Sequence, residues 1–196
     1  MQTARINSQK LALLGMLTAI VAVMQWLASV LPIFPFTLTL VLIPIVIGAA
    51  LCGTAAGAWL GFVFSFVVLV AGQATPFMVI SIPGTLIIVI FKGTLCGLCA
   101  ALVYKMLAGK NKTSAVIAAA VVCPVINTGI FIIGSYIFFL PAITMWGEGA
   151  GFDNVTSYIF LGLVGINFPL ELAFNLVLSP VIVRLIQLRQ DKRLTV

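Results

Sequence analysis

The 196-residue chain contains no histidine and only four acidic residues. The lack of histidine removes the commonest metal ligand and the usual general base. The sequence also has no HExxH motif, no phosphate-binding glycine-rich loop and no paired aspartates in an apolar run. Cys96 and Cys99 have CxxC spacing without a second pair, so we interpret them as packing residues. These absences argue against an enzyme, and we expect no metal site and no cofactor.

Charge is also scarce, since charged residues make up 7% of the chain. A soluble domain carries about 25%. Hydrophobic residues reach 63%, and the mean hydropathy is +1.29. We therefore predict a single polytopic membrane domain over residues 1–196, embedded in a lipid bilayer. The net charge of +6 is explained by cytoplasmic anchoring residues rather than by nucleic-acid binding, because no soluble basic face is present.

The apolar runs and their glycine and proline breaks predict six helices, over about 10–31, 38–51, 58–71, 85–107, 115–140 and 157–188. The basic residues decide whether the stretch 38–72 crosses the membrane once or twice. All but one of them fall in three clusters, at 5–10, 105–112 and 184–193. If all three clusters are cytoplasmic, an even number of spans separates them, which requires two helices in 38–72. We predict an all-α integral membrane protein with six transmembrane helices and both termini in the cytoplasm.

Lys92 is the basic residue outside those clusters, and it lies within an apolar run. A lysine in the middle of a transmembrane helix costs about 3 kcal/mol, so it should face a cavity or a partner. At about 1.5 Å per residue, Lys92, Asn127 and Glu171 each lie about 20 Å from the nearest cytoplasmic cation of their helix. Asn167 and Glu171 share one face of the last helix. The count predicts a polar layer in the outer half of the membrane.

Two interpretations of this layer remain open. Lys92 and Glu171 either form a buried ion pair that fixes helix packing, or they belong to a solute site. The outer loops add one amide and three aromatic side chains that we expect to roof such a site. The candidate substrate-binding residues are Lys92, Asn127, Asn167, Glu171, Gln73, Trp146, Phe152 and Tyr158.

The first helix carries small residues along one face. Gly15 and Ala19 form a small-xxx-small pair, and Ala12 and Ala22 extend it. Such a face lets another helix approach closely. The next two helices add Gly48, Gly53, Gly57 and Gly61. These small residues serve either internal packing or the docking of a partner protein.

Several segments together resemble the substrate-binding membrane subunit, or S component, of energy-coupling-factor (ECF) vitamin transporters. They are residues 11–19, the glycine-rich stretch 48–57, the segment 91–97 followed by Tyr104 and Lys105, and Asn127 to Gly129. The family usually has an Ala-xxx-Ala motif on its first helix, and the nearest match here is Gly15-xxx-Ala19.

The resemblance implies that the first three helices dock to a transmembrane coupling subunit, which in turn binds two cytoplasmic ATPases. It also implies a prokaryotic cell membrane and a small-molecule vitamin held near the outer face by the last three helices. In the family, the loaded subunit topples in the membrane to release its solute inside.

The charge of Lys92 favours a solute with a carboxylate, such as pantothenate, biotin or lipoate. A neutral or cationic vitamin, such as riboflavin, thiamine or pyridoxamine, would use Glu171 instead. A structural or assembly subunit of the membrane that binds no solute is the remaining alternative.

Overall fold

The computed structural model describes residues 8–30 and 40–194, with side chains up to residue 184. Within these residues the chain is helical and contains no strand. The elements are α1 (Ser8–Val30), α2 (Leu42–Cys52), α3 (Thr54–Val70), α4 (Thr75–Met78), α5 (Ile82–Leu107), α6 (Lys112–Phe138), α7 (Leu140–Gly149), α8 (Val155–Ser157), the π-helix η1 (Tyr158–Val164) and α9 (Asn167–Leu194).

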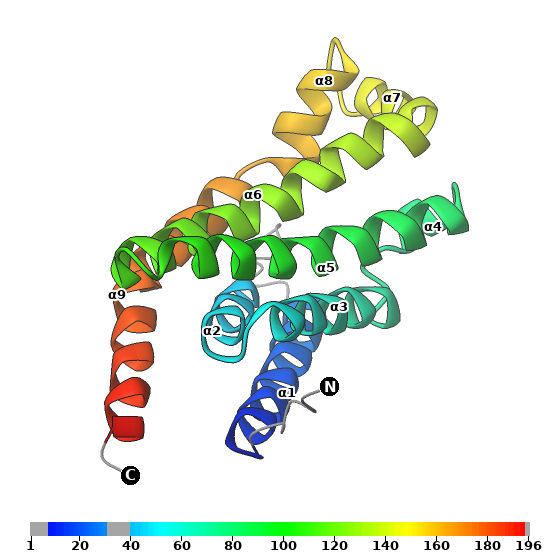
Figure 1. Ribbon diagram of the computed structural model, residues 1–196. Helices are drawn as coiled ribbons and strands as arrows, with labels where there is room; N and C mark the ends of the chain where they lie inside the picture. Colours follow the sequence, from blue (N-terminus) through cyan, green and yellow to red (C-terminus); the bar gives the residue numbers. More distant parts are fainter. Residues whose placement is uncertain (1–7, 31–39, 195–196) are drawn as a thin grey trace.

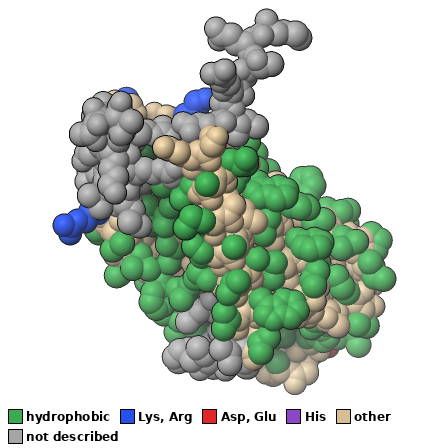
Figure 2. All heavy atoms as spheres, turned by 90° about the horizontal axis from the view of Figure 1, so that it is seen from below, with side chains coloured by type: hydrophobic (Ala, Val, Ile, Leu, Met, Phe, Trp, Pro, Cys, Tyr) green, Lys and Arg blue, Asp and Glu red, His purple; other side chains and the backbone are tan. Residues whose placement is uncertain are grey.

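Helix α5 is the centre of the arrangement, because it packs against α3 on one side and α6 on the other (Figure 1). Helix α9 packs along α6, and α1 packs against α2 and α3. The start of α1 and the end of α9 lie toward the lower part of Figure 1, whereas α4 and α7 lie at its upper right. Figure 2 shows a face covered mostly by hydrophobic side chains, with Lys and Arg gathered near one end. This surface suits a lipid environment.

Three of the described helices, α1, α5 and α6, are long and apolar enough to cross a membrane. The unit of α8, η1 and α9 is a fourth candidate if it is taken as one bent span. Helix α2 has 11 residues and α3 has 17. At 1.5 Å per residue α2 is about 16 Å long, well short of a 30 Å hydrocarbon core. The all-helical class is therefore confirmed with three or four candidate spans, whereas six crossings and cytoplasmic termini stay predictions.

The last predicted helix, 157–188, is divided in the structure. η1 ends at Val164, and the next residue, Gly165, has a φ of 46° and a ψ of −139° that suit a residue without a side chain. α9 then begins at Asn167, and the two parts are bent by 44°. The predicted single helix is therefore two helical parts with a bend between them.

Two loops expected between helices also contain short helices. α4 lies in the predicted loop 72–84, and α7 lies in the predicted loop 141–156. Each has a proline in its first turn, where the missing N–H costs no hydrogen bond. The predicted loop after the first helix, the start of 38–51 and Arg5 lie outside the described residues, as do the side chains of Arg189, Lys192 and Arg193.

Helices α3 and α5 approach each other through glycine. A methyl group added to Gly57 would collide with the carbonyl of Gly97, and one added to Gly61 would collide with that of Gly93. Each helix thus contributes two glycines four residues apart, the spacing that lets helix backbones touch in membranes. One turn further along α3, Ser65 Oγ donates a 2.6 Å hydrogen bond to the carbonyl of Val89 on α5.

Two further glycines, Gly48 and Gly53, position α2 against α3. Gly53, with a φ of 99°, is the one residue between the two helices, where we predicted a turn over 52–57. A Cβ on Gly48 would meet the side chain of Leu60 on α3. Gly48, Gly57 and Gly61 therefore serve internal packing, and they are not part of a docking face.

Gly61→Ala should lower the stability of the fold by about 1–3 kcal/mol, because overpacking against a backbone carbonyl cannot be relieved by a side-chain rotation. The measurement is the apparent melting temperature of the purified protein in detergent. The matched control is Gly129→Ala in α6, where an added Cβ has no atom within 4 Å. Equal melting temperatures for the two variants would contradict the close α3–α5 contact.

Candidate functional site

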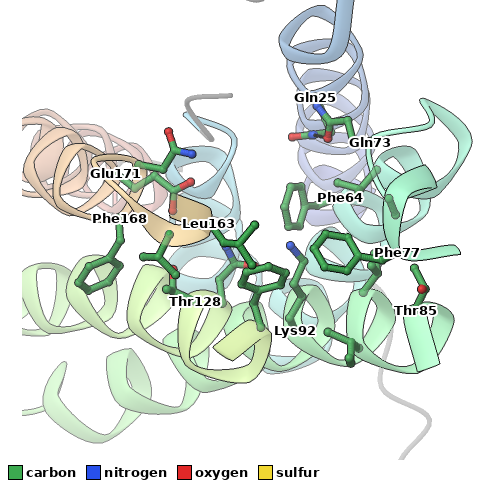
Figure 3. Close-up of a pocket in the computed structure, with 18 of the residues that line it drawn as sticks. Gln25, Phe64, Gln73, Phe77, Thr85, Lys92, Thr128, Leu163, Phe168 and Glu171 are labelled. Carbon is green, nitrogen blue, oxygen red and sulfur yellow. Dashed lines mark hydrogen bonds between the residues drawn. The ribbon is translucent and has the colours of Figure 1, made fainter. Parts of the chain in front are cut away.

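A cavity of about 210 Å³ lies between the helices (Figure 3). Its wall is shared by many elements: α1, α3, the segment 73–77, α5, α6, η1 and α9, together with Phe139. The lining residues are Gln25, Ala28, Phe64, Val68, Gln73, Ala74, Phe77, Thr85, Ile88, Val89, Lys92, Asn127, Thr128, Phe131, Phe139, Leu163, Val164, Asn167, Phe168 and Glu171. The cavity is smaller than the 300–1,000 Å³ of drug-sized sites, so it suits a small solute.

The α5 wall is a stripe of one helix face. Thr85, Ile88, Val89 and Lys92 follow at intervals of three and four residues, so they point the same way. The start of this helix is fixed by Ser81, whose side chain accepts a hydrogen bond from Gly84 N at 3.2 Å. Its middle is fixed by the glycine contact with α3. Lys92 is adjacent to Gly93, so the same contact positions the lysine.

Lys92 extends from α5 into the cavity and reaches the faces of two aromatic rings (Figure 3). Its Nζ lies 5.9 Å from the centroid of Phe64 on α3 and 5.6 Å from that of Phe131 on α6. Both distances are within the range of a cation–π interaction. The ring faces stabilise the ammonium without neutralising it, so its positive charge can attract an anion in the cavity.

Glu171 enters the cavity from α9, on a different side from Lys92 (Figure 3). The side chain is buried, with 5% of its surface exposed. Asn167 lies one turn before Glu171, and Asn127 on α6 lines the same cavity. The Oδ1 atoms of both asparagines have no hydrogen-bond partner among the described residues. The cavity therefore carries a cationic part, an anionic part and unsatisfied amide oxygens.

Gln25 and Gln73 form the polar part of the wall on the α1 side. Gln25 Nε2 donates to Gln73 Oε1 at 2.6 Å. Gln25 is 3% exposed although it belongs to a long apolar helix. The bond joins α1 to the turn that follows α3, and both amides line the cavity.

Phe77 of α4 closes the cavity toward the short helix α7. Its ring lies 5.7 Å from that of Phe131, 5.0 Å from Phe139 and 5.6 Å from Trp146. Separations of this size are typical of aromatic clusters. This cluster gives the cavity a large apolar wall, suited to the hydrocarbon part of a solute.

Five of the eight candidate substrate-binding residues line this one cavity: Lys92, Asn127, Asn167, Glu171 and Gln73. The other three do not line it. Trp146 packs against Phe77, which lines the cavity, without lining the cavity itself. Phe152 packs on Tyr158 with ring centroids 5.3 Å apart. Trp146 on α7 and Tyr158 on η1 belong to one hydrophobic cluster, whereas Phe152 lies between α7 and α8. The helix α7 was not foreseen, because residues 141–156 were expected to form a loop.

The sequence interpretation missed Gln25, Phe64, Phe77 and Phe131. Gln25 carried a usable signal, since an amide within an apolar run needs a buried partner. The phenylalanines carried none, because membrane helices contain many. The expected division between docking helices and solute helices is also less sharp than predicted, because α1 and α3 contribute to the cavity wall.

The small-residue face of α1 lies on the surface of the chain. Ala12, Gly15 and Ala19 are exposed, and Ala22 is partly buried. A Cβ on Gly15 would have no atom within 4 Å. The face is therefore not used for packing against other described parts of this chain.

No group of three or more potential metal-ligating side chains occurs in the described part of the chain. In comparison with known proteins, the model of the family described as "ECF transporter, substrate-specific component" matches residues 9–183. No curated protein and no solved structure matches the chain.

Proposed function

Because this chain belongs to the family of ECF transporter substrate-specific components, we propose that it captures a vitamin-like acid in the cavity beside Lys92. The family is one of transporter binding subunits rather than enzymes, and it implies a multi-pass membrane protein. Membership favours a solute-binding role over a structural subunit that binds no solute.

The observation that carries the proposal is the position of the Lys92 ammonium. It enters a 210 Å³ cavity and lies over the rings of Phe64 and Phe131. A carboxylate there would form charge-assisted hydrogen bonds in a medium of low dielectric. The phenylalanines of the wall would cover the apolar part of the solute. Pantothenate, biotin and lipoate are acids of this kind, and a cationic solute would be repelled by the same ammonium.

The remaining steps belong to the same proposal and are supported by the family membership and, for the termini, by the three basic clusters. The solute enters from the outer face of a prokaryotic plasma membrane, and both termini lie in the cytoplasm. The exposed face of α1 docks to a transmembrane coupling subunit, to which two cytoplasmic ATPases bind. The exposure of Gly15 and Ala19 supports this choice of face.

Lys92→Met should weaken the binding of an acidic vitamin by about 2–3 kcal/mol, because a charge-assisted contact in a dry site is lost. This is roughly a 30- to 150-fold increase in Kd. Equilibrium binding to the purified protein measures it. The matched control is Lys105→Met, the same change at an exposed position on the same helix. Unchanged affinity for an acidic vitamin in a folded Lys92→Met protein would contradict the proposal that Lys92 binds a carboxylate.

Glu171 provides the opposing test, since a neutral or cationic vitamin such as riboflavin, thiamine or pyridoxamine would depend on its buried carboxylate. We expect Glu171→Gln to keep most of the affinity for an acid, because the amide preserves size and hydrogen bonding. If Glu171→Gln lowers the affinity for a ligand more than Lys92→Met lowers the affinity for the same ligand, the neutral or cationic alternative is favoured.

Tryptophan at Gly15 or Ala19 should abolish uptake while leaving solute binding intact. The indole would prevent close approach of another helix, and neither position lines the cavity. Uptake is measured in cells that express the coupling module, and binding is measured on purified protein. Val177→Trp on α9 is the control, because it adds the same bulk at a position that is 72% exposed. Parallel loss of binding and uptake would contradict the assignment of this face.

A further inference from the structure

The amide pair of Gln25 and Gln73 has a property that neither helix packing nor the charge of Lys92 explains. Each primary amide offers one acceptor oxygen and two N–H donors. Their mutual bond, from Gln25 Nε2 to Gln73 Oε1, uses one nitrogen and one oxygen. Gln25 Oε1 and Gln73 Nε2 are buried and have no hydrogen-bond partner among the described residues. Leaving a buried polar group unsatisfied is costly, so the wall of the cavity holds two unmet hydrogen-bonding groups.

The two unsatisfied atoms are of opposite kind, one acceptor and one donor. This holds whichever way the amides are oriented. If both amides are rotated by 180°, the bond between them is kept in reverse. Gln25 Nε2 and Gln73 Oε1 then become the unsatisfied atoms, again one donor and one acceptor. The complementarity of the pair therefore does not depend on how nitrogen and oxygen are assigned.

We propose that Gln25 and Gln73 form a subsite for a neutral group that presents a donor beside an acceptor, as a cyclic amide or ureide does. A carboxylate fits this subsite poorly, because it only accepts and would oppose the amide oxygen. An ammonium fits poorly for the converse reason, since it only donates. Both glutamines line the cavity; Gln25 is 97% buried and Gln73 is partly buried, so water competes little for the Gln25 amide.

This inference rests on the proposed function and narrows it. Lys92 enters the cavity from α5, and the amide pair enters from α1 and the turn after α3 (Figure 3). The two subsites therefore bind different parts of one solute. The geometry selects an acid whose other end carries an amide or ureide edge, with an apolar part against the phenylalanines.

Biotin and lipoate are a suitable pair of probes. Both carry a pentanoate arm on a five-membered sulfur ring, and biotin alone adds a fused cyclic ureide. Riboflavin is a third probe, because it has an imide edge without a carboxylate. We expect the unsubstituted protein to bind biotin at least about tenfold more tightly than lipoate, the factor that about 1.4 kcal/mol of hydrogen bonding provides.

Gln25→Met should remove this difference in affinity. We expect it to raise the Kd for biotin at least about tenfold and the Kd for lipoate less than about threefold. Gln73→Met removes the other amide and should have the same effect, which guards against misfolding of either variant. Gln9→Met is the matched control, because it makes the same change at an exposed position of α1. Binding is measured for each purified variant with each of the three probes.

The amide subsite is overturned if biotin binds no more tightly than lipoate and riboflavin does not bind. It is also overturned if Gln25→Met lowers the affinities for biotin and lipoate by the same factor. The proposed function is tested separately, by measuring the binding of biotin and lipoate to Lys92→Met. Suppose that Gln25→Met lowers the affinity for biotin or riboflavin, but Lys92→Met leaves the affinities for biotin and lipoate unchanged. The carboxylate proposal is then wrong, and the amide subsite is still supported.

Discussion

The contact between α3 and α5 determines where the polar chemistry of this protein lies. Gly57 and Gly61 face Gly97 and Gly93 with no side chain between the backbones. Dispersion and close packing drive helix association inside a membrane, where the hydrophobic effect contributes little. The glycine surfaces therefore allow close van der Waals contact between α3 and α5, and they also fix the position of one helix against the other. Because Lys92 precedes Gly93 in the chain, the contact also brings its ammonium to the ring of Phe64 on α3.

A second constraint is the cost of polar groups in a low-dielectric interior. Within the described chain, the buried polar residues of α1 and α9 include Gln25, Glu171 and Asn175. Asn175 Nδ2 donates to the carbonyl of Glu171 at 2.8 Å, and Gln25 bonds to Gln73. The ammonium of Lys92 has aromatic faces instead. The surroundings of Gln25 and Lys92 lower the cost of burying them without using all their hydrogen-bonding or charge capacity, and both side chains line the cavity.

The sequence predicted the features that depend on composition and on single costly residues. Low charge indicated the membrane, and the lysine at position 92 indicated a cavity, where the structure places it. Local breaks were harder to predict. The break after η1 depends on the positive φ of Gly165, and a glycine in an apolar run is as often a packing residue. The phenylalanine wall was unpredictable for a similar reason, since Phe64 and exposed Phe66 differ by only two positions and the turn of the helix decides which one faces inward.

Helix α1 combines two surfaces that the sequence suggested should belong to separate halves of the protein. Gly15 and Ala19 are exposed along the outside, whereas Gln25 is buried against the cavity about five turns from the start of the helix. The bond between Gln25 and Gln73 fixes this end of α1 to the turn after α3. The position of the exposed face relative to the cavity is therefore set partly by an amide pair that also lines the cavity. If a solute bonds to these amides as proposed, it contacts the same two side chains that hold this end of α1, so solute binding and the placement of α1 are thermodynamically linked.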